Sequence, residues 1–253
     1  MKNKVALITG GSSGIGQAIA LRYAAAGARV AVVASSDVSK AQATVDTIRA
    51  AGGTAEAFAA DVREADAVQD LVARVAASLG PVEILVTAAG IFLPTPIGEA
   101  DLDVFEQMFD TNVKAVFQCV NAVVPGMKAA GGGRIVCLSS VAATLGVGGF
   151  SAYCASKAAV SMMVRTLAIE LAPHNININA IAPGNTETPM NEGMRTDPAQ
   201  AALLEGLKAA TPSKRIFSSP EDIAELAFFL MSPAARAMHG STVLMDEGLS
   251  AGM

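Results

Sequence analysis

The feature that most constrains this chain is a regular alternation of short β-branched runs with longer Ala-rich stretches. The β-branched runs cover residues 5–9, 29–33, 55–59, 83–87, 134–138, 176–181 and 242–245, and helical apolar spacing covers residues 15–26, 38–50, 65–78, 102–129, 152–172 and 221–232. Strands that alternate with helices predict βαβ units and a parallel sheet. We therefore expect an α/β fold, with a doubly wound seven-stranded parallel sheet and helices on both faces.

Length and composition limit the function classes that remain. The chain has 253 residues, of which 52% are hydrophobic, so one large core and a single domain over residues 1–253 are expected. The formal net charge is −5 and the sequence contains no basic run, which argues against nucleic acid as a partner. No apolar run approaches the roughly 18 residues that suggest a membrane span. We expect a cytoplasmic protein without a membrane partner.

The cysteines and histidines do not form a recognisable metal or disulfide pattern. Cys119, Cys137 and Cys154 are widely spaced, odd in number and set in apolar surroundings, so we interpret them as buried, reduced thiols. His174 and His239 are isolated from one another and from carboxylates at metal-ligand spacing. No metal site and no catalytic histidine are expected.

A glycine-rich segment follows the first predicted strand. Residues 9–16 read Thr-Gly-Gly-Ser-Ser-Gly-Ile-Gly and lead into an Ala-rich helical stretch. Glycines let the backbone turn tightly and approach a pyrophosphate, whose charge is met by the positive end of the following helix. An ordinary tight turn has similar letters, but the position in the first βαβ unit favours a dinucleotide site. The expected contacts are Gly10, Ser12, Ser13, Gly14, Ile15 and Gly16.

A second pattern places Tyr153 and Lys157 four residues apart in a stretch with helical character. Residues at this spacing share a helix face, so the ammonium of Lys157 can lower the pKa of the phenol. A phenol with a lowered pKa exchanges a proton with a substrate oxygen near neutral pH. Such a pair is commonly a solvated surface pair. Here it follows Ser140 at the exit of the predicted strand 134–138, and the combination predicts a catalytic group.

These segments, together with Asp61-Val62, Ala88-Ala89-Gly90, Asn112 and Pro183-Gly184, resemble the short-chain dehydrogenase/reductase family, in its 3-oxoacyl-reductase-like subgroup, over nearly the whole chain. The resemblance implies a Rossmann fold, a nicotinamide cofactor and a Ser–Tyr–Lys group assisted by Asn. By position, Tyr153 would be the acid/base and Lys157 would lower its pKa and hold the nicotinamide ribose. Ser140 would bond the substrate oxygen, and Asn112 would anchor a water in the proton relay.

The same resemblance implies further cofactor contacts, some of which have a simpler interpretation. Asp61 and Val62 would lie beside the adenine, with Ala89, Gly90, Pro183, Gly184, Thr186 and Thr188 along the rest of the cofactor. Asp61 could instead cap the helix that follows it. Asn112 could be a poor helix former on a surface, although the family role implies a distorted helix and an inward side chain. Ser139 is expected to be a structural hydroxyl.

Two departures from the family pattern bear on the cofactor. Thr87-Ala88-Ala89-Gly90 stands where the family usually has Asn-Asn-Ala-Gly, and the second strand ends in Ala34-Ser35-Ser36-Asp37. Ala34 occupies the position of the acid that favours NAD, while Ser35 and Ser36 could bond a 2′-phosphate. This favours NADP(H). NAD(H) stays possible, because Ser13 carries no charge where many NADP-preferring members have Arg, and because Asp37 lies close by.

For the substrate, the sequence gives mainly exclusions. The basic residues that carrier-protein reductases present to their acidic carrier are replaced by Gly131 and His174, so a small neutral ketone or alcohol is the expected partner. Residues 188–214 are expected to form a helical lid, although an amphipathic surface helix would have the same pattern. The other expected walls are Phe92, Leu93, Ala142, Val147 and Phe150.

Several alternatives stay open at this point. A 3-oxoacyl-thioester reductase, a sugar or polyol dehydrogenase and a cofactor-sensing protein without turnover would share most of these motifs. The resemblance also implies a homo-oligomer, a tetramer or dimer, packed through helices 102–129 and 152–172. Asp246-Glu247-Gly248 departs from the family's usual Asp-Gly-Gly and is expected to close the last strand.

Overall fold

A seven-stranded sheet organises the computed structural model, which describes residues 1–251. Its strands are β1 (Val5–Thr9), β2 (Arg29–Ala34), β3 (Thr54–Ala59), β4 (Val82–Thr87), β5 (Gly133–Leu138), β6 (Ile176–Pro183) and β7 (Thr242–Met245). The strand order is β3-β2-β1-β4-β5-β6-β7, and all neighbouring strands are parallel. This confirms the predicted fold class, a doubly wound Rossmann-type α/β fold.

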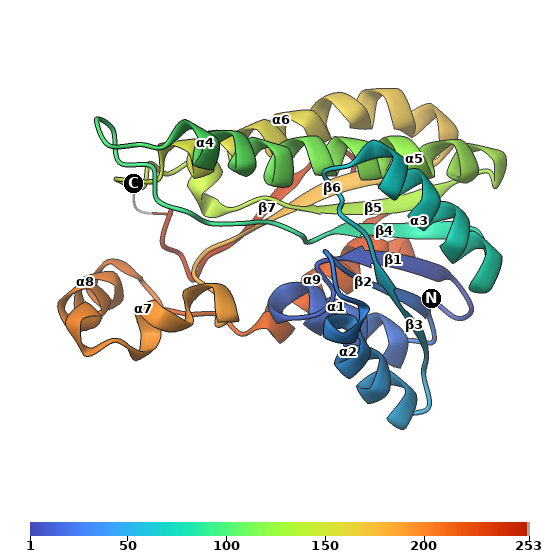
Figure 1. Cartoon of the computed structure of the whole chain (residues 1–253), viewed down its shortest axis with the longest axis horizontal. Coiled ribbons are helices and arrows are strands. Elements are labelled where there is room, and N and C mark those ends of the chain that lie inside the picture. The colour runs from blue at the N-terminus through green and yellow to red at the C-terminus, as the bar shows by residue number, and fades with distance from the viewer. Residues whose placement is uncertain (252–253) are drawn as a thin grey trace.

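Helices cover both faces of the sheet (Figure 1). The helices are α1 (Gly14–Ala25), α2 (Val38–Ala50), α3 (Ala65–Ser78), α4 (Leu102–Phe109), α5 (Ala115–Ala129), α6 (Ser151–Leu171), α7 (Glu192–Thr196), α8 (Ala201–Ala210) and α9 (Pro220–Met231). Helices α3, α5 and α6 supply one buried cluster, and α1, α2 and α9 supply the other. Helices α7 and α8 lie outside these layers, beside the sheet (Figure 1).

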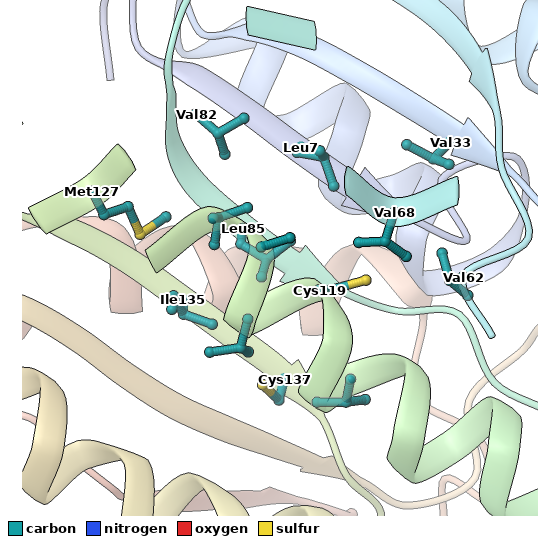
Figure 2. Close-up of a cluster of buried hydrophobic side chains, with 14 of the residues drawn as sticks. Leu7, Val33, Val62, Val68, Val82, Leu85, Cys119, Met127, Ile135 and Cys137 are labelled. Atoms are coloured by element: carbon teal, nitrogen blue, oxygen red, sulfur yellow. The ribbon is translucent and has the colours of Figure 1, made fainter. Parts of the chain in front are cut away.

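Alternation along each strand divides the core between the two faces. In β1, Val5 and Leu7 belong to one buried cluster, and Ala6 and Ile8 belong to the other. Successive side chains of a strand point to opposite faces, so a strand covered on both sides is apolar at every position. Figure 2 shows the first cluster, where Leu7 of β1 lies among residues of β4, β5, α3 and α5.

One predicted helix is interrupted. The helix expected over residues 102–129 is distorted at Asn112, as the family resemblance implied, because α4 and α5 are joined by a turn of π-helix at Asp110–Lys114. A π-turn inserts an extra residue into the hydrogen-bonding pattern and rotates the side chains that follow it. The remaining strands and α-helices in the layers agree with the prediction within about two residues, the usual uncertainty of element ends. β6 extends through Pro183, which was expected to start a loop.

The topology predicts where a ligand would bind. The strand order reverses between β1 and β4, since the chain builds outward from β1 to β3 and then returns to add β4. In doubly wound sheets, ligands bind beyond the carboxyl ends of the strands at this switch point. The segments that follow β1, β4, β5 and β6 all leave the sheet at this edge. Over the described part of the chain, no helix has the length and apolar character to cross a membrane.

Candidate active site

The glycine-rich segment forms a close-packed turn between β1 and α1. Gly10 has φ +65°, and a Cβ there would lie 2.7 Å from the backbone nitrogen of Ala89. A Cβ on Gly16 would collide with the carbonyl oxygen of Gly10. Within residues 1–251, the Ser13 side chain makes no capping hydrogen bond to α1, whose first turn holds no acidic residue. The start of α1 therefore keeps free N–H groups and positive potential, which fit a dinucleotide pyrophosphate.

The end of β2 presents hydroxyl groups without a free carboxylate beside them. Ala34 is the last residue of β2 and is buried, whereas Ser35 and Ser36 are exposed. Asp37 caps α2, because its Oδ1 accepts a hydrogen bond of 2.8 Å from the backbone N–H of Ser39. The hydrogen bonds from Ser39 hold the pKa of Asp37 below its usual range. The carboxylate of Asp37, the nearest one in sequence to Ser35 and Ser36, is thus engaged in capping α2.

Asp61 follows β3 and pairs with an arginine that sequence reasoning did not single out. Arg63 donates to both carboxylate oxygens of Asp61, with distances of 2.9 Å from Nε to Oδ1 and 2.6 Å from Nη2 to Oδ2. Helix α3 begins at Ala65, with Glu64 in the capping position. The interpretation of Asp61 as the cap of that helix is therefore wrong. The adjacent Val62 is buried.

Asn112 lies in the π-turn and is fully buried, so its interpretation as a surface residue is wrong. Its Oδ1 accepts from the backbone N–H of Ile91 at 2.9 Å, and its Nδ2 donates to the Ile91 carbonyl at 2.9 Å and to Ser156 Oγ at 3.1 Å. Ser156 in turn donates to the carbonyl of Tyr153. One amide therefore ties the exit of β4 to α6. Sequence reasoning missed Ser156, whose only signal was its place inside the Tyr-to-Lys spacing.

Lys157 projects from α6 toward the exits of β4 and β5. Its side chain is buried, and Nζ donates a 2.9 Å hydrogen bond to the carbonyl of Leu138. A Cβ built on Gly90 would lie 3.6 Å from this Nζ and 3.1 Å from Asn112 Oδ1. Burial lowers the pKa of Lys157 to about 8. The structure thus places Gly90, Asn112 and Lys157 in direct proximity.

Tyr153 and Ser140 meet at the same edge. Ser140 lies two residues after the end of β5, and its Oγ accepts from the N–H of Ala142 at 3.2 Å. Burial raises the pKa of the Tyr153 phenol, and hydrogen bonding with Ser140 lowers it. Lys157 Nζ lies 5.7 Å from the centre of the tyrosine ring. In the protein alone, the influence that lowers this pKa comes from Ser140 rather than from Lys157.

Ser139 has the expected structural role. Its Oγ donates to the carbonyl of Lys157 at 3.0 Å and lies 2.8 Å from Ser161 Oγ. Both contacts fasten the end of β5 to α6.

An aromatic cluster stands against the tyrosine. Phe92 and Phe150 stack with ring centroids 4.2 Å apart, and the edge-to-face contact between Phe92 and Tyr153 measures 4.6 Å. These two phenylalanines come from the segment after β4 and from the residue before α6. Of the other expected wall residues, Leu93 is partly buried, Val147 is exposed and Ala142 is buried.

The segment after β6 reaches back to the glycine-rich turn. A Cβ on Gly14 would lie 3.1 Å from Thr188 Cγ2, so Thr188 touches the start of α1. Thr186 is buried and forms an isolated bridge with Ser218. Pro183 ends β6, and Gly184 packs closely on Asp246, where a Cβ would approach the Asp246 Cα to 2.8 Å.

The cysteines and histidines are not among the residues of the candidate active site. Cys119 and Cys137 are buried free thiols, and burial raises the pKa of each. Cys154 is only partly buried, which corrects the expectation of full burial. His239 Nε2 lies 2.9 Å from Asn177 Nδ2, and His174 is exposed. In the described chain, His, Cys, Asp and Glu side chains do not gather in a group able to hold a metal ion.

Comparison with known proteins agrees with this geometry. A family model for the short chain dehydrogenases matches residues 4–199. The chain is 35% identical to the 2,3-dihydro-2,3-dihydroxybenzoate dehydrogenase of Bacillus subtilis, covering 100% of this chain and 98% of that protein. It is 36% identical to a 3-oxoacyl-(acyl-carrier-protein) reductase of Staphylococcus epidermidis, covering 98% and 99%.

A solved structure shares the whole fold. The crystal structure of a protein from Beutenbergia cavernae, assigned as an NAD(P)-dependent gluconate 5-dehydrogenase, superposes with a TM-score of 0.91 at 35% identity, covering 99% of this chain and 98% of that chain. That structure contains NADP at low occupancy.

The buried ammonium of Lys157 predicts a pH-dependent stability. Its folded pKa of about 8 lies below the value of an unfolded lysine, so between these values the unfolded chain binds more protons and stability rises with pH. Below the folded pKa the burial penalty is fully present. Lys157→Met removes it. We expect wild type to gain stability relative to this variant, on the order of 3 kcal/mol, between about pH 7 and about pH 10.

Urea unfolding of both proteins at a series of pH values measures this difference. Lys128→Met, at an exposed lysine of α5, is the control and should leave the pH dependence as in wild type. Parallel stability curves for wild type and Lys157→Met would contradict the prediction.

Proposed function

The chain belongs to the short-chain dehydrogenase family and is an NAD(P)-dependent oxidoreductase, and we propose that it interconverts a small neutral ketone and the matching secondary alcohol. The observation that carries this proposal is the convergence of Tyr153, Lys157 and Ser140 beyond the carboxyl ends of β4 and β5. This group lies at the switch point of the sheet, where the glycine-rich turn and Thr188 also meet.

In the proposed mechanism, Tyr153 transfers the proton to or from the substrate oxygen. The Ser140 hydroxyl, whose hydrogen bonding lowers the pKa of the phenol, would bond the same oxygen. When bound, the nicotinamide supplies or accepts the hydride. Lys157 would donate toward the cofactor ribose from a position fixed by the Leu138 carbonyl, and in the complex with the cofactor its positive charge would favour the ionised phenol.

Asn112 acts by positioning in this proposal. Both N–H groups of its amide are engaged, one by the Ile91 carbonyl and one by Ser156. These bonds hold the exit of β4 against the turn of α6 that carries Tyr153 and Lys157. As the family pattern implies, Asn112 would also anchor a water in the proton relay behind Lys157.

We propose that the cofactor lies along the carboxyl edge of the sheet. The turn at Gly10, Ser12, Ser13, Gly14, Ile15 and Gly16 would hold the pyrophosphate, because the free N–H groups at the start of α1 point there. Asp61 and Val62 would lie beside the adenine and Ala89 and Gly90 beside the ribose next to Lys157. Pro183, Gly184, Thr186 and Thr188 would hold the nicotinamide.

The proposed substrate is apolar around its reacting carbon. The stacked pair of Phe92 and Phe150 forms an aromatic wall against Tyr153. Residues 188–214 are the proposed lid, and Met190 and Leu203 on it are largely exposed in the monomer. Flexible and apolar side chains adapt to varied apolar ligands. Relatives named for a dihydrodiol, a carrier thioester and gluconate define the competing substrate classes.

The carrier-thioester alternative is the weaker one for this chain. Gly131 and His174 stand where carrier-binding enzymes would present basic residues, and both positions are exposed. An acidic carrier protein would meet little complementary charge there.

Substitution of the proposed acid/base gives the first test. Tyr153→Phe keeps the ring but removes the proton donor, so turnover should fall at least about a thousandfold while cofactor affinity changes little. The measurement follows absorbance of the reduced nicotinamide against neutral ketones, diones, sugars and acyl thioesters. Tyr23→Phe is a matched control, because Tyr23 is the other tyrosine of the chain and bonds Ala227 within the core.

Two results would contradict the assignment. Turnover in Tyr153→Phe equal to that of wild type would exclude Tyr153 as the acid/base. Tight cofactor binding with no turnover on any member of the panel would favour a cofactor-sensing protein.

We further propose a preference for NADP(H) over NAD(H). Two exposed hydroxyls, Ser35 and Ser36, follow β2, and the carboxylate of Asp37 is occupied by Ser39 at the start of α2. Ala34 leaves the ribose side of the site without the acidic group that repels a 2′-phosphate.

Ala34→Asp tests this preference. A carboxylate at the end of β2 should shift the ratio of kcat/KM for NADPH and NADH toward NADH by about tenfold or more. Ala34→Asn is the control, since it has nearly the same shape without the charge. An unchanged ratio in Ala34→Asp would mean that Ala34 does not face the ribose.

We also propose that the chain forms a homo-oligomer, a tetramer or dimer, through α5 and α6. Phe117 on α5 and Met162 and Ile169 on α6 are 51%, 58% and 78% exposed in the monomer. Large apolar side chains that are exposed on a monomer are typical of association surfaces.

Sedimentation equilibrium tests this assembly. The native mass should correspond to two or four chains, and Ile169→Glu should shift the distribution toward the monomer because a charge resists burial. A wild-type monomer at micromolar concentration would contradict the proposal.

A further inference from the structure

The proposed lid is anchored almost entirely at its ends. None of residues 188–210, all within the described chain, is buried, although they form α7 and α8. Figure 1 shows both helices standing apart from the layers of the sheet. A segment with few buried contacts opens at low free energy. Its position in the monomer is therefore determined by the contacts where it leaves and rejoins the body.

The first anchor is a short backbone ribbon. The N–H of Glu187 donates to the Ser218 carbonyl at 3.0 Å, and the N–H of Ser218 donates to the Asn185 carbonyl at 2.9 Å. The chain that enters the lid thus runs beside the chain that returns from it.

The second anchor is an ion pair with the C-terminal turn. Arg215, on the returning chain, donates to Glu247 Oε1 from Nη2 at 2.6 Å and from Nε at 3.0 Å. Ser218 Oγ donates to the same oxygen at 2.9 Å. The Glu247 side chain is only 12% exposed, whereas that of Arg215 is 59% exposed. The hydrogen bonds from Arg215, and to a smaller extent from Ser218, hold the pKa of Glu247 below its usual range. The carboxylate is therefore charged at neutral pH.

The backbone at this turn is unusual for a glutamate. Glu247 has φ +59°, in the left-handed region that favours glycine. The neighbouring Gly248 packs on Pro212, where a Cβ would lie 3.2 Å from Cγ. A residue with a Cβ is held in this conformation only when its surroundings stabilise it. Here the N–H of Ser213 donates to the Glu247 carbonyl at 3.3 Å, so a backbone hydrogen bond holds the turn in addition to the bonds of the carboxylate.

We propose that Glu247 and Arg215 are positioning residues that latch the lid over the substrate pocket. The inference rests on the proposed function, in which residues 188–214 cover the substrate. Arg215 Nη2 also lies 3.5 Å from Asp222 Oδ2, which takes part in the cap of α9. The latch therefore links the returning chain to two fixed elements, the C-terminal turn and α9.

Two variants separate the charge from the backbone. Glu247→Gly removes the carboxylate and also relieves the left-handed conformation, so the turn itself stays formed. Arg215→Gln removes the other partner and leaves the turn unchanged. In both, hydrogen exchange of residues 192–210 should quicken about fivefold and KM for the substrate should rise about fivefold, with cofactor affinity unchanged.

The control is Lys4→Gln, which removes a 2.9 Å ion pair to Glu83 at the opposite edge of the sheet. It should change neither readout. A conservative substitution, Arg215→Lys, keeps the charge and should restore part of the protection.

Hydrogen exchange tests whether the latch exists, and KM tests whether the latch positions the lid for the substrate. Unchanged exchange in the lid of Glu247→Gly and Arg215→Gln would overturn the latch, whatever the enzyme turns over. Faster exchange with an unchanged KM would overturn the assignment of these residues as positioning residues for the substrate. Failure of wild type to turn over any substrate would instead overturn the proposed function, and the exchange readout would still decide whether the latch exists.

Discussion

Burial of a parallel sheet on both faces is the constraint on which the rest of this structure depends. Each strand must present apolar side chains in both directions, as β1 does with Leu7 on one face and Ile8 on the other. The polar side chains of the candidate site follow the ends of these strands. The carboxyl ends of β1, β4, β5 and β6 meet at one edge, and the candidate active site occupies that edge.

Polar groups at this edge are buried, and hydrogen bonds make their burial possible. Lys157 bonds the Leu138 carbonyl, and Asn112 bonds Ile91 and Ser156. A buried polar group without a partner would destabilise the fold, so these bonds both satisfy the groups and fix their positions. Burial also alters the proton affinities of the groups, because it lowers the pKa of Lys157 and raises that of Tyr153. The proposed chemistry and the stability of the edge thus rest on the same contacts.

The segment at the periphery of the site is held by few buried contacts. The segment that carries α7 and α8 has almost no buried surface of its own and relies on the ribbon at Ser218 and on the pair between Arg215 and Glu247. Weakly packed segments move readily, which suits a cover over a pocket that a substrate enters and leaves. In the proposed function, the rigid edge of the sheet carries the catalytic groups, and the loosely attached cover controls access of the substrate.

The sequence by itself determined the fold class, the order of strands and helices, and the placement of the glycine-rich turn, Ser140, Tyr153 and Lys157 on their elements. These follow from local periodicity and from spacing along one helix, which do not depend on distant contacts. Only the tertiary structure decided that Asn112 bonds Ile91 and Ser156, that Asp61 pairs with Arg63 and that Glu247 holds Arg215. These features join residues of different elements or depend on the packing around them, and no pattern within one segment records which partner the fold brings near.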